Sequence, residues 1–131
     1  MKDSFEKVRS YLLDLGHTIS KENEEDGVFV VEDEGLGLKN LVIGCVDPIL
    51  IMEQFILELN NANTDILQRI LQKNRDIIHG AFVLDESGKK LIFRDTLQLE
   101  NLDVNELEGS INSLTLLLSE YSDELIKFSK N

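Results

Sequence analysis

The acidic segment from Glu22 to Asp33 is the local pattern that comes nearest to a metal site. Its acids alternate along the segment, Gly27 is its sixth residue and Asp33 its twelfth, an order that resembles a calcium-binding loop. The match is incomplete, because such loops begin with Asp, end with a bidentate Glu and lead into a helix. We interpret the segment as a solvated acidic turn between strands. A calcium-responsive or small-ligand regulatory protein is kept as an alternative.

The two histidines and the single cysteine do not combine into a catalytic or metal-binding group. His17 and His79 each follow a predicted helix, where the helix dipole favours a partly protonated imidazole. Cys45 lies between Gly44 and Val46 in an apolar segment, so we expect a small buried side chain and not a nucleophile. The sequence has no G-x-S-x-G elbow and no glycine-rich phosphate cradle. We therefore predict no enzyme activity, no metal and no cofactor.

Length and charge narrow the class of protein further. The 131 residues suit one domain, and we expect residues 1–131 to form it. With 25 acidic residues against 13 basic ones the net charge is -12, which argues against binding to nucleic acid phosphates. A single cysteine and the lack of a long apolar run favour a cytoplasmic protein with no membrane span. Charge alone also permits an acidic decoy that imitates nucleic acid and occupies a basic partner.

The first half of the chain shows one helix and then strands. Apolar residues at helical spacing predict a helix over residues 4–15, with Asp3 and Glu6 placed as a capping box. β-branched and aromatic clusters predict strands over 28–33 and 39–46, which pair as antiparallel neighbours. Residues 49–59 fit both the helical and the strand period. Their isoleucine and phenylalanine content favours a strand.

The second half contains a helix, a hairpin and a long helix. Asn63 or Thr64 caps a helix that ends near Arg75, and its predicted buried face is Ile66, Leu67, Ile70 and Leu71. Strands over 81–84 and 90–97 flank a four-residue polar connection that contains a glycine. A continuous apolar seam predicts a helix from the cap Asp103 to about residue 129.

Basic residues gather in the region between Asp65 and Arg94. Six of the 13 basic residues fall there together with only four acids, whereas residues 98–131 carry seven acids and two lysines. Such polarity could orient a homodimer or an acidic partner, or could simply reflect solvated lysines at edges and turns.

The elements read α-β-β-β-α-β-β-α, and three segments carry a family resemblance. Residues 71–75 (Leu-Gln-Lys-Asn-Arg), 79–85 (His-Gly-Ala-Phe-Val-Leu-Asp) and 91–97 (Leu-Ile-Phe-Arg-Asp-Thr-Leu) resemble the core of the YbjN-like family. That family is related in fold to the class I type III secretion chaperones, also called Tir chaperones. Residues 47–50 and 55–57 look like the family's third strand. The resemblance implies an α+β fold with a twisted, largely antiparallel sheet of about five strands packed by three helices.

The resemblance also implies a function. It predicts a non-enzymatic chaperone-like or adaptor protein that forms a homodimer and binds extended segments of an unknown protein client. It predicts no nucleic acid, membrane or cofactor. Six residues are candidates for contact with a client or a second subunit: Leu50, Met52, Ile66, Ile70, Phe82 and Phe93. Ile66 and Ile70 are the candidates for the dimer seam. Each of the six is also expected in the core, since apolar strand residues usually face the one core of a domain.

Overall fold

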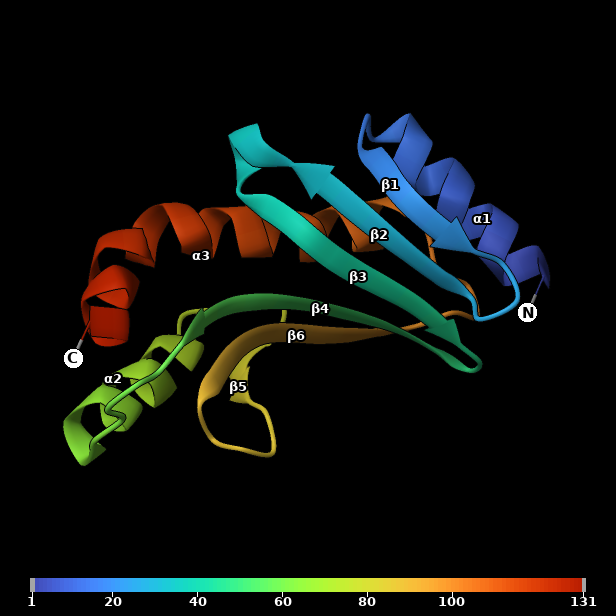
Figure 1. Ribbon diagram of the computed structural model, residues 1–131. Coiled ribbons are helices and arrows are strands. Elements are labelled where there is room, and N and C mark those ends of the chain that lie inside the picture. The colour runs from blue at the N-terminus through green and yellow to red at the C-terminus, as the bar shows by residue number, and fades with distance from the viewer. Residues whose placement is uncertain (1, 131) are drawn as a thin grey trace.

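Three helices and a six-stranded sheet make up the protein. The computed structural model describes residues 2–130 (Figure 1). The elements are α1 (Lys2–Asp14), β1 (Thr18–Asn23), β2 (Val28–Asp33), the 3-10 turn η1 (Glu34–Leu36), β3 (Leu38–Val46), β4 (Ile49–Glu58), α2 (Thr64–Asn74), β5 (Ala81–Leu84), β6 (Lys90–Gln98) and α3 (Val104–Lys130). All neighbouring strands are antiparallel, and their order in the sheet is β1-β2-β3-β4-β6-β5. The predicted α+β class is confirmed.

The sheet has one strand more than the sequence predicts. The missed strand is β1, which lies at the edge of the sheet and pairs only with β2. Five of its six side chains are exposed, and only Ile19 is partly buried. A strand with so little apolar alternation carries almost no strand signal, which explains the omission. The ambiguous segment 49–59 is a strand, as predicted.

Two details of the helices differ from the prediction. α1 begins at Lys2, so Asp3 lies inside its first turn and is not the N-cap. Leu71 of α2 is 68% exposed instead of buried. The reason is its position about 140° around the helix from Ile66, because α2 buries only a narrow face centred on Ile66 and Ile70.

The predicted helix caps are otherwise present. Asn63 caps α2 by accepting a hydrogen bond from the Ile66 N–H at 2.9 Å. At the start of α3 the Asp103 carboxylate accepts from the Glu106 N–H at 2.8 Å, and the Glu106 side chain accepts from the Asp103 N–H at 3.3 Å. Within residues 2–130, no helix is both long and apolar enough to cross a membrane.

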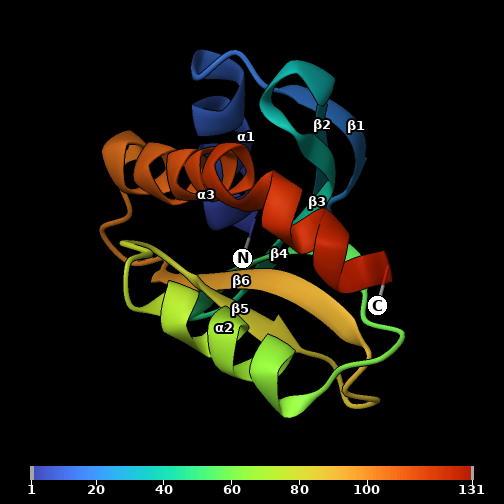
Figure 2. The same cartoon turned by 90° about the vertical axis from the view of Figure 1, so that its left-hand side faces the viewer.

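The helices lie on one face of the sheet or beside its edge. α1 and α3 cover the same face, while α2 lies next to β5 and the C-terminal half of α3 (Figures 1 and 2). The core fills the space between that face and the helices, with the phenyl rings of Phe5 and Phe29 stacked at 4.2 Å between centroids. Neither view shows a helix over the opposite face, which we call the outer face.

Candidate functional site

The six candidate contact residues all lie in the core. Their side chains are at most 4% exposed and belong to one cluster of buried residues: Leu50, Met52, Ile66, Ile70, Phe82 and Phe93. This agrees with the core interpretation given for each of them. Their side chains contribute almost nothing to the surface of this chain, so a partner must contact other residues first.

The acidic segment forms the turn of the β1–β2 hairpin. Asn23 and Asp26 hydrogen-bond to each other across the turn, and Glu22 forms an ion pair with Arg9 of α1. Among the described residues, no group of three His, Cys, Asp or Glu side chains is placed to hold a metal ion. Two carboxylates of this hairpin, those of Glu22 and Asp26, are therefore engaged in local contacts.

The cysteine and the histidines are also separate from one another. Cys45 is 1% exposed, and burial raises the pKa of its thiol to about 11, so the thiol is protonated at neutral pH and is a poor nucleophile. His79 is held by its backbone, whose N–H donates to the Ser113 hydroxyl and whose carbonyl accepts from it. His17 lies between α1 and β1.

A groove opens where β3 and β4 separate, on the side of the sheet that α3 covers. β4 pairs with β6 from Ile49 to Glu58, but its pairing with β3 stops at Glu53. The groove has a volume of about 870 Å³ and lies between η1, the ends of these two strands and the middle of α3. We call it the α3–β4 groove. Its lining residues are Gly35, Leu36, Gly37, Lys39, Gln54, Phe55, Ile56, Asn112, Thr115, Leu116, Leu118, Ser119 and Ser122.

Gln54 connects the two separated strands. Its side chain is 4% exposed and faces the core side of β4, where a polar residue needs hydrogen-bond partners. The Gln54 amide nitrogen donates to the Gly37 carbonyl at 3.0 Å, and its oxygen accepts from the Lys39 N–H at 3.2 Å. One side chain thus links β4 to the start of β3 beyond the point where their backbone pairing ends.

Gly37 brings the turn close to α3. Its φ of 78° is in the left-handed region that favours glycine, and a Cβ at this position would lie 3.1 Å from the Leu118 Cδ1. A larger residue would therefore push η1 away from α3. The glycine fixes how near the two walls of the groove approach each other.

The lining of the groove combines apolar and uncharged polar side chains, and Lys39 is its one charged residue. Leu36, Phe55 and Leu116 are between 45% and 58% exposed, which is high for large apolar side chains. α3 also contributes Leu118, three hydroxyl side chains and one amide, and no carboxylate lines the groove. In a chain with a net charge of -12, this groove can receive an apolar, uncharged segment without electrostatic repulsion.

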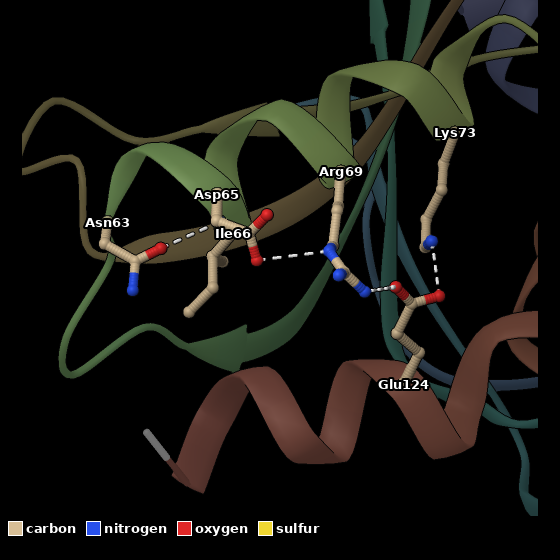
Figure 3. Close-up of polar contacts among 6 residues, drawn as sticks. All are labelled: Asn63, Asp65, Ile66, Arg69, Lys73 and Glu124. Carbon is tan, nitrogen blue, oxygen red and sulfur yellow. Dashed lines mark hydrogen bonds and ion pairs between the residues drawn. The ribbon is translucent and has the colours of Figure 1, made fainter.

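The predicted basic region is partly neutralised within the chain. Glu124 of α3 contacts Lys73 at 2.5 Å and Arg69 at 3.7 Å, and Arg69 also contacts Asp65 at 3.1 Å (Figure 3). The Lys73 ammonium lies 4.8 Å from the centre of the Tyr121 ring. Two of the six bases therefore join α2 to α3, and their charge is less available to a partner than the sequence indicates.

The sequence contained signals for the groove that periodicity did not reveal. Gln54 is a polar residue at a core-facing position of an apolar strand, which marks a specific hydrogen-bonding role. Leu116 widens the apolar seam of α3 beyond one face, and Leu36 is a large apolar residue in a glycine-rich turn. Sequence alone gives no indication that these three residues meet.

Comparisons with known proteins place the fold in a family. No curated protein sequence matches the chain. Its fold is shared by YbjN from E. coli, a candidate transcription regulator, with a TM-score of 0.69, 13% identity and 92% of each chain covered. It is shared by the structure of the HopA1-SchA chaperone-effector complex, with a TM-score of 0.66, 13% identity and coverage of 91% of this chain and 94% of that one.

A third solved structure shares the fold. An uncharacterized protein from Methanothermobacter thermautotrophicus has a TM-score of 0.59 at 15% identity, over 95% of this chain and 99% of that one. The fold is thus that of the type III secretion chaperones, and the resemblance to YbjN is confirmed. The CesT_Tir_1 family model matches residues 1–131, and the chain belongs to the CesT_Tir_1 family.

Proposed function

We propose that this chain is a non-enzymatic, chaperone-like protein of the cytoplasm that binds an extended segment of a protein partner in the α3–β4 groove and acts as a homodimer. The observation that carries the proposal is the open side of β4. Residues 54–58 of β4 pair with β6 on one side, and on the other side the pairing with β3 has already ended. The groove lies along this open side.

An extended segment suits such a groove. Backbone groups along one open side of a strand can hydrogen-bond to an added strand, and alternate side chains of that strand can enter apolar pockets. Leu36, Phe55 and Leu116 would contact those side chains. A segment of apolar and uncharged polar residues fits this lining best.

Family membership and fold also support the binding of a protein segment. The chain belongs to the CesT_Tir_1 family, and its fold is that of a structure containing a chaperone with its effector. The calcium alternative has no comparable support, because Glu22 and Asp26 of the acidic hairpin are engaged in contacts with Arg9 and Asn23. The decoy alternative rests on the net charge alone. A net charge of -12 also opposes binding to DNA.

Peptide binding tests the proposal. The probe is a fluorescein-labelled, uncharged peptide of about twelve residues in which valine alternates with serine or threonine, long enough for two average strands. We expect Leu116→Glu to weaken binding at least tenfold, or about 1.4 kcal/mol, because it places a carboxylate in an apolar groove. Fluorescence anisotropy measures the affinity.

The matched control is Leu13→Glu. Leu13 lies on α1, outside the groove, and is 58% exposed, the same as Leu116. The Leu13→Glu chain should bind the peptide with the affinity of the unmodified chain. A second peptide that contains repeated Pro-Pro pairs lacks N–H donors on both of its edges and should not bind. Equal binding by Leu116→Glu and Leu13→Glu, or undiminished binding of the proline peptide, would contradict the proposal.

A further inference from the structure

A second, smaller hollow lies on the opposite side of α3 from the groove. One wall is the loop of residues 75–80 between α2 and β5, and the other is a face of α3. We call this hollow, of about 220 Å³, the α3–loop pocket. Figure 2 shows α3 between β2 and α2, with one hollow on each side of the helix. The two linings share only Asn112 and Leu116, which form the ridge between them.

The pocket has apolar walls and is formed before any partner binds. Leu117 of α3 lines its interior and is 3% exposed, whereas Ile78 of the loop is 82% exposed and available for contact. The Ser113 hydroxyl donates to the His79 carbonyl at 2.7 Å and accepts from the His79 N–H at 3.3 Å. These bonds hold the loop on α3, so little ordering is needed when a ligand enters.

Gly109 leaves room in the pocket. Glycine inside a helix lowers helix stability relative to most other residues. Position 109 lies within α3 and does not have the positive φ that would require glycine. A Cβ there would lie 3.4 Å from the His79 Nε2, between the two walls. The lack of a side chain at this position thus keeps space open between the loop and α3.

The rim of the pocket is acidic, unlike the groove. Asp76 and Glu120 are exposed and line the pocket, and no lysine or arginine lines it. Within residues 2–130 neither carboxylate forms an ion pair, whereas the nearby Lys73 is paired with Glu124 (Figure 3). Burial raises the pKa of Tyr121, and the negative charges of Glu120 and Asp76 raise it further. The mouth of the pocket therefore favours a positively charged group.

We infer that the α3–loop pocket receives one apolar side chain of the protein partner, flanked by lysine or arginine residues that pair with Asp76 and Glu120. The inference rests on the proposed function and adds a second, basic stretch to the bound segment. A volume of about 220 Å³ is below the roughly 300–1,000 Å³ of pockets that enclose a whole small ligand, but suits one anchor side chain. A basic segment also complements the rim, which a second copy with a net charge of -12 does not.

One partner segment can reach both hollows. A helix with its side chains is about 10–12 Å across, and an extended chain advances about 3.3 Å per residue. A link of about four to six residues therefore crosses the ridge at Asn112 and Leu116. So short a link gives the second stretch an effective concentration in the millimolar range, so even a weak anchor contact raises the total affinity.

Fluorescence anisotropy on the full chain tests the inference with labelled peptides. The first is the uncharged peptide described above. The second adds to it a Gly-Ser linker of about five residues and the sequence Lys-Phe-Lys, attached at the N-terminus or the C-terminus in separate peptides. In two control peptides alanine replaces the phenylalanine, or glutamate replaces both lysines.

The anchor should strengthen binding. We expect the Lys-Phe-Lys peptide, in its better orientation, to bind at least tenfold more tightly than the uncharged peptide. Both control peptides should lose this gain, because one lacks the apolar anchor and the other is repelled by the rim. The inference is overturned if Lys-Phe-Lys gives no gain in either orientation, or if a control peptide shows the same gain.

Neutralising the rim tests the charges. Asp76→Asn together with Glu120→Gln should reduce the gain at least fivefold. The matched control is Glu108→Gln together with Asp123→Asn, which neutralises two exposed acids that do not line the pocket. Both double variants change the net charge by the same two units, so the control should keep the full gain. An equal loss in both would show that the lysines respond only to the overall charge, which contradicts the inference.

Filling the pocket tests the anchor. Gly109→Leu should abolish the gain and leave the affinity for the uncharged peptide unchanged, because position 109 does not line the groove. Leucine favours a helix more than glycine does, and circular dichroism checks the fold. If this variant misfolds, Ile78→Ala replaces it, with the exposed Leu13→Ala on α1 as control. A gain that persists in folded Gly109→Leu, or that is equal in Ile78→Ala and Leu13→Ala, overturns the inference.

The anchor alone separates this inference from the proposed function. Acetyl-Lys-Phe-Lys-amide is titrated into the chain, and NMR follows the methyl signals of Ile78 and Leu117. Methyl shifts that Gly109→Leu abolishes, without binding of the uncharged peptide, support the pocket and overturn the groove. Binding of the uncharged peptide that Leu116→Glu abolishes, without methyl shifts or a gain from the linked peptide, overturns the pocket and leaves the groove in place.

Discussion

The carboxamide of Asn74 closes the free edge of β5 at Phe82. The Phe82 N–H donates to the Asn74 Oδ1 at 2.7 Å, and the Asn74 Nδ2 donates to the Phe82 carbonyl at 3.2 Å. The two contacts reproduce what a neighbouring strand would supply to one residue. The last residue of α2 thus supplies hydrogen bonds to the outer edge of β5. Asn74 belongs to the segment 71–75 that resembles the YbjN-like family, so this residue of the segment has a structural role.

Asn74→Ala should destabilise the protein by about 1–2 kcal/mol, because both Phe82 backbone groups lose their partner beside a buried ring. Alanine favours helices more than asparagine does, so an effect on helix propensity alone would stabilise the protein instead of destabilising it. Urea unfolding followed by circular dichroism measures the change. Gln72→Ala, an exposed neighbour on α2, is the control and should be neutral.

Gln54→Leu should cost about 1–3 kcal/mol of folding free energy. Leucine fits an apolar site, but it leaves the Gly37 carbonyl and the Lys39 N–H without their partner. Peptide affinity should fall as well, since Gln54 lines the groove and links β4 to the start of β3. Thermal unfolding and anisotropy give the two readouts, and a variant as stable as the unmodified chain would show that Gln54 is not needed to join the strands.

Glu124→Gln should destabilise the protein by about 1–2 kcal/mol. Lys73 is only 11% exposed in its side chain and would lose its carboxylate partner at 2.5 Å, while the more exposed Arg69 contributes little. Asp123→Asn removes the same charge from an exposed neighbour and controls for the change in net charge. Equal stability of the two variants would mean that the α2–α3 ion pairs do not stabilise the fold.

Alkaline pH should destabilise the protein through Cys45. The pKa of its thiol is 9.0 in an ordinary environment and about 11 in the fold, because burial disfavours the thiolate. Below pH 9 the thiol is protonated in both states. Between pH 9 and about 11 the unfolded chain loses the proton first, so stability falls as pH rises. Denaturation midpoints across this range should fall less in Cys45→Ala than in the unmodified chain.

Much of the fold follows from local patterns. The β5–β6 hairpin has a polar turn with Gly88 at a φ of 74°, and α3 has both partners of its capping box, so each is specified by residues close in sequence. β1 could not be found in this way. Its structure depends on pairing with β2, and its polar side chains leave no periodic signal.

The candidate site could be predicted only in part. Periodicity shows that Leu50 and Met52 lie on the same face of β4. It does not tell whether that face contacts a partner or the chain's own helices. In the structure both side chains are buried in the core beneath the helices. The groove depends on where β3 leaves β4, which is a matter of tertiary geometry. Leu36 and Leu116 are 80 positions apart in the sequence, so no local rule connects them.

The irregular, charged edge strand β1 protects the protein against polymerisation. Its pairing with β2 shifts between Ile19 and Lys21, and its residues Lys21 and Glu22 carry charge, so another sheet cannot continue the ladder in register. Asn74 blocks the opposite edge. Sheet extension into fibres is therefore hindered at both edges of the sheet.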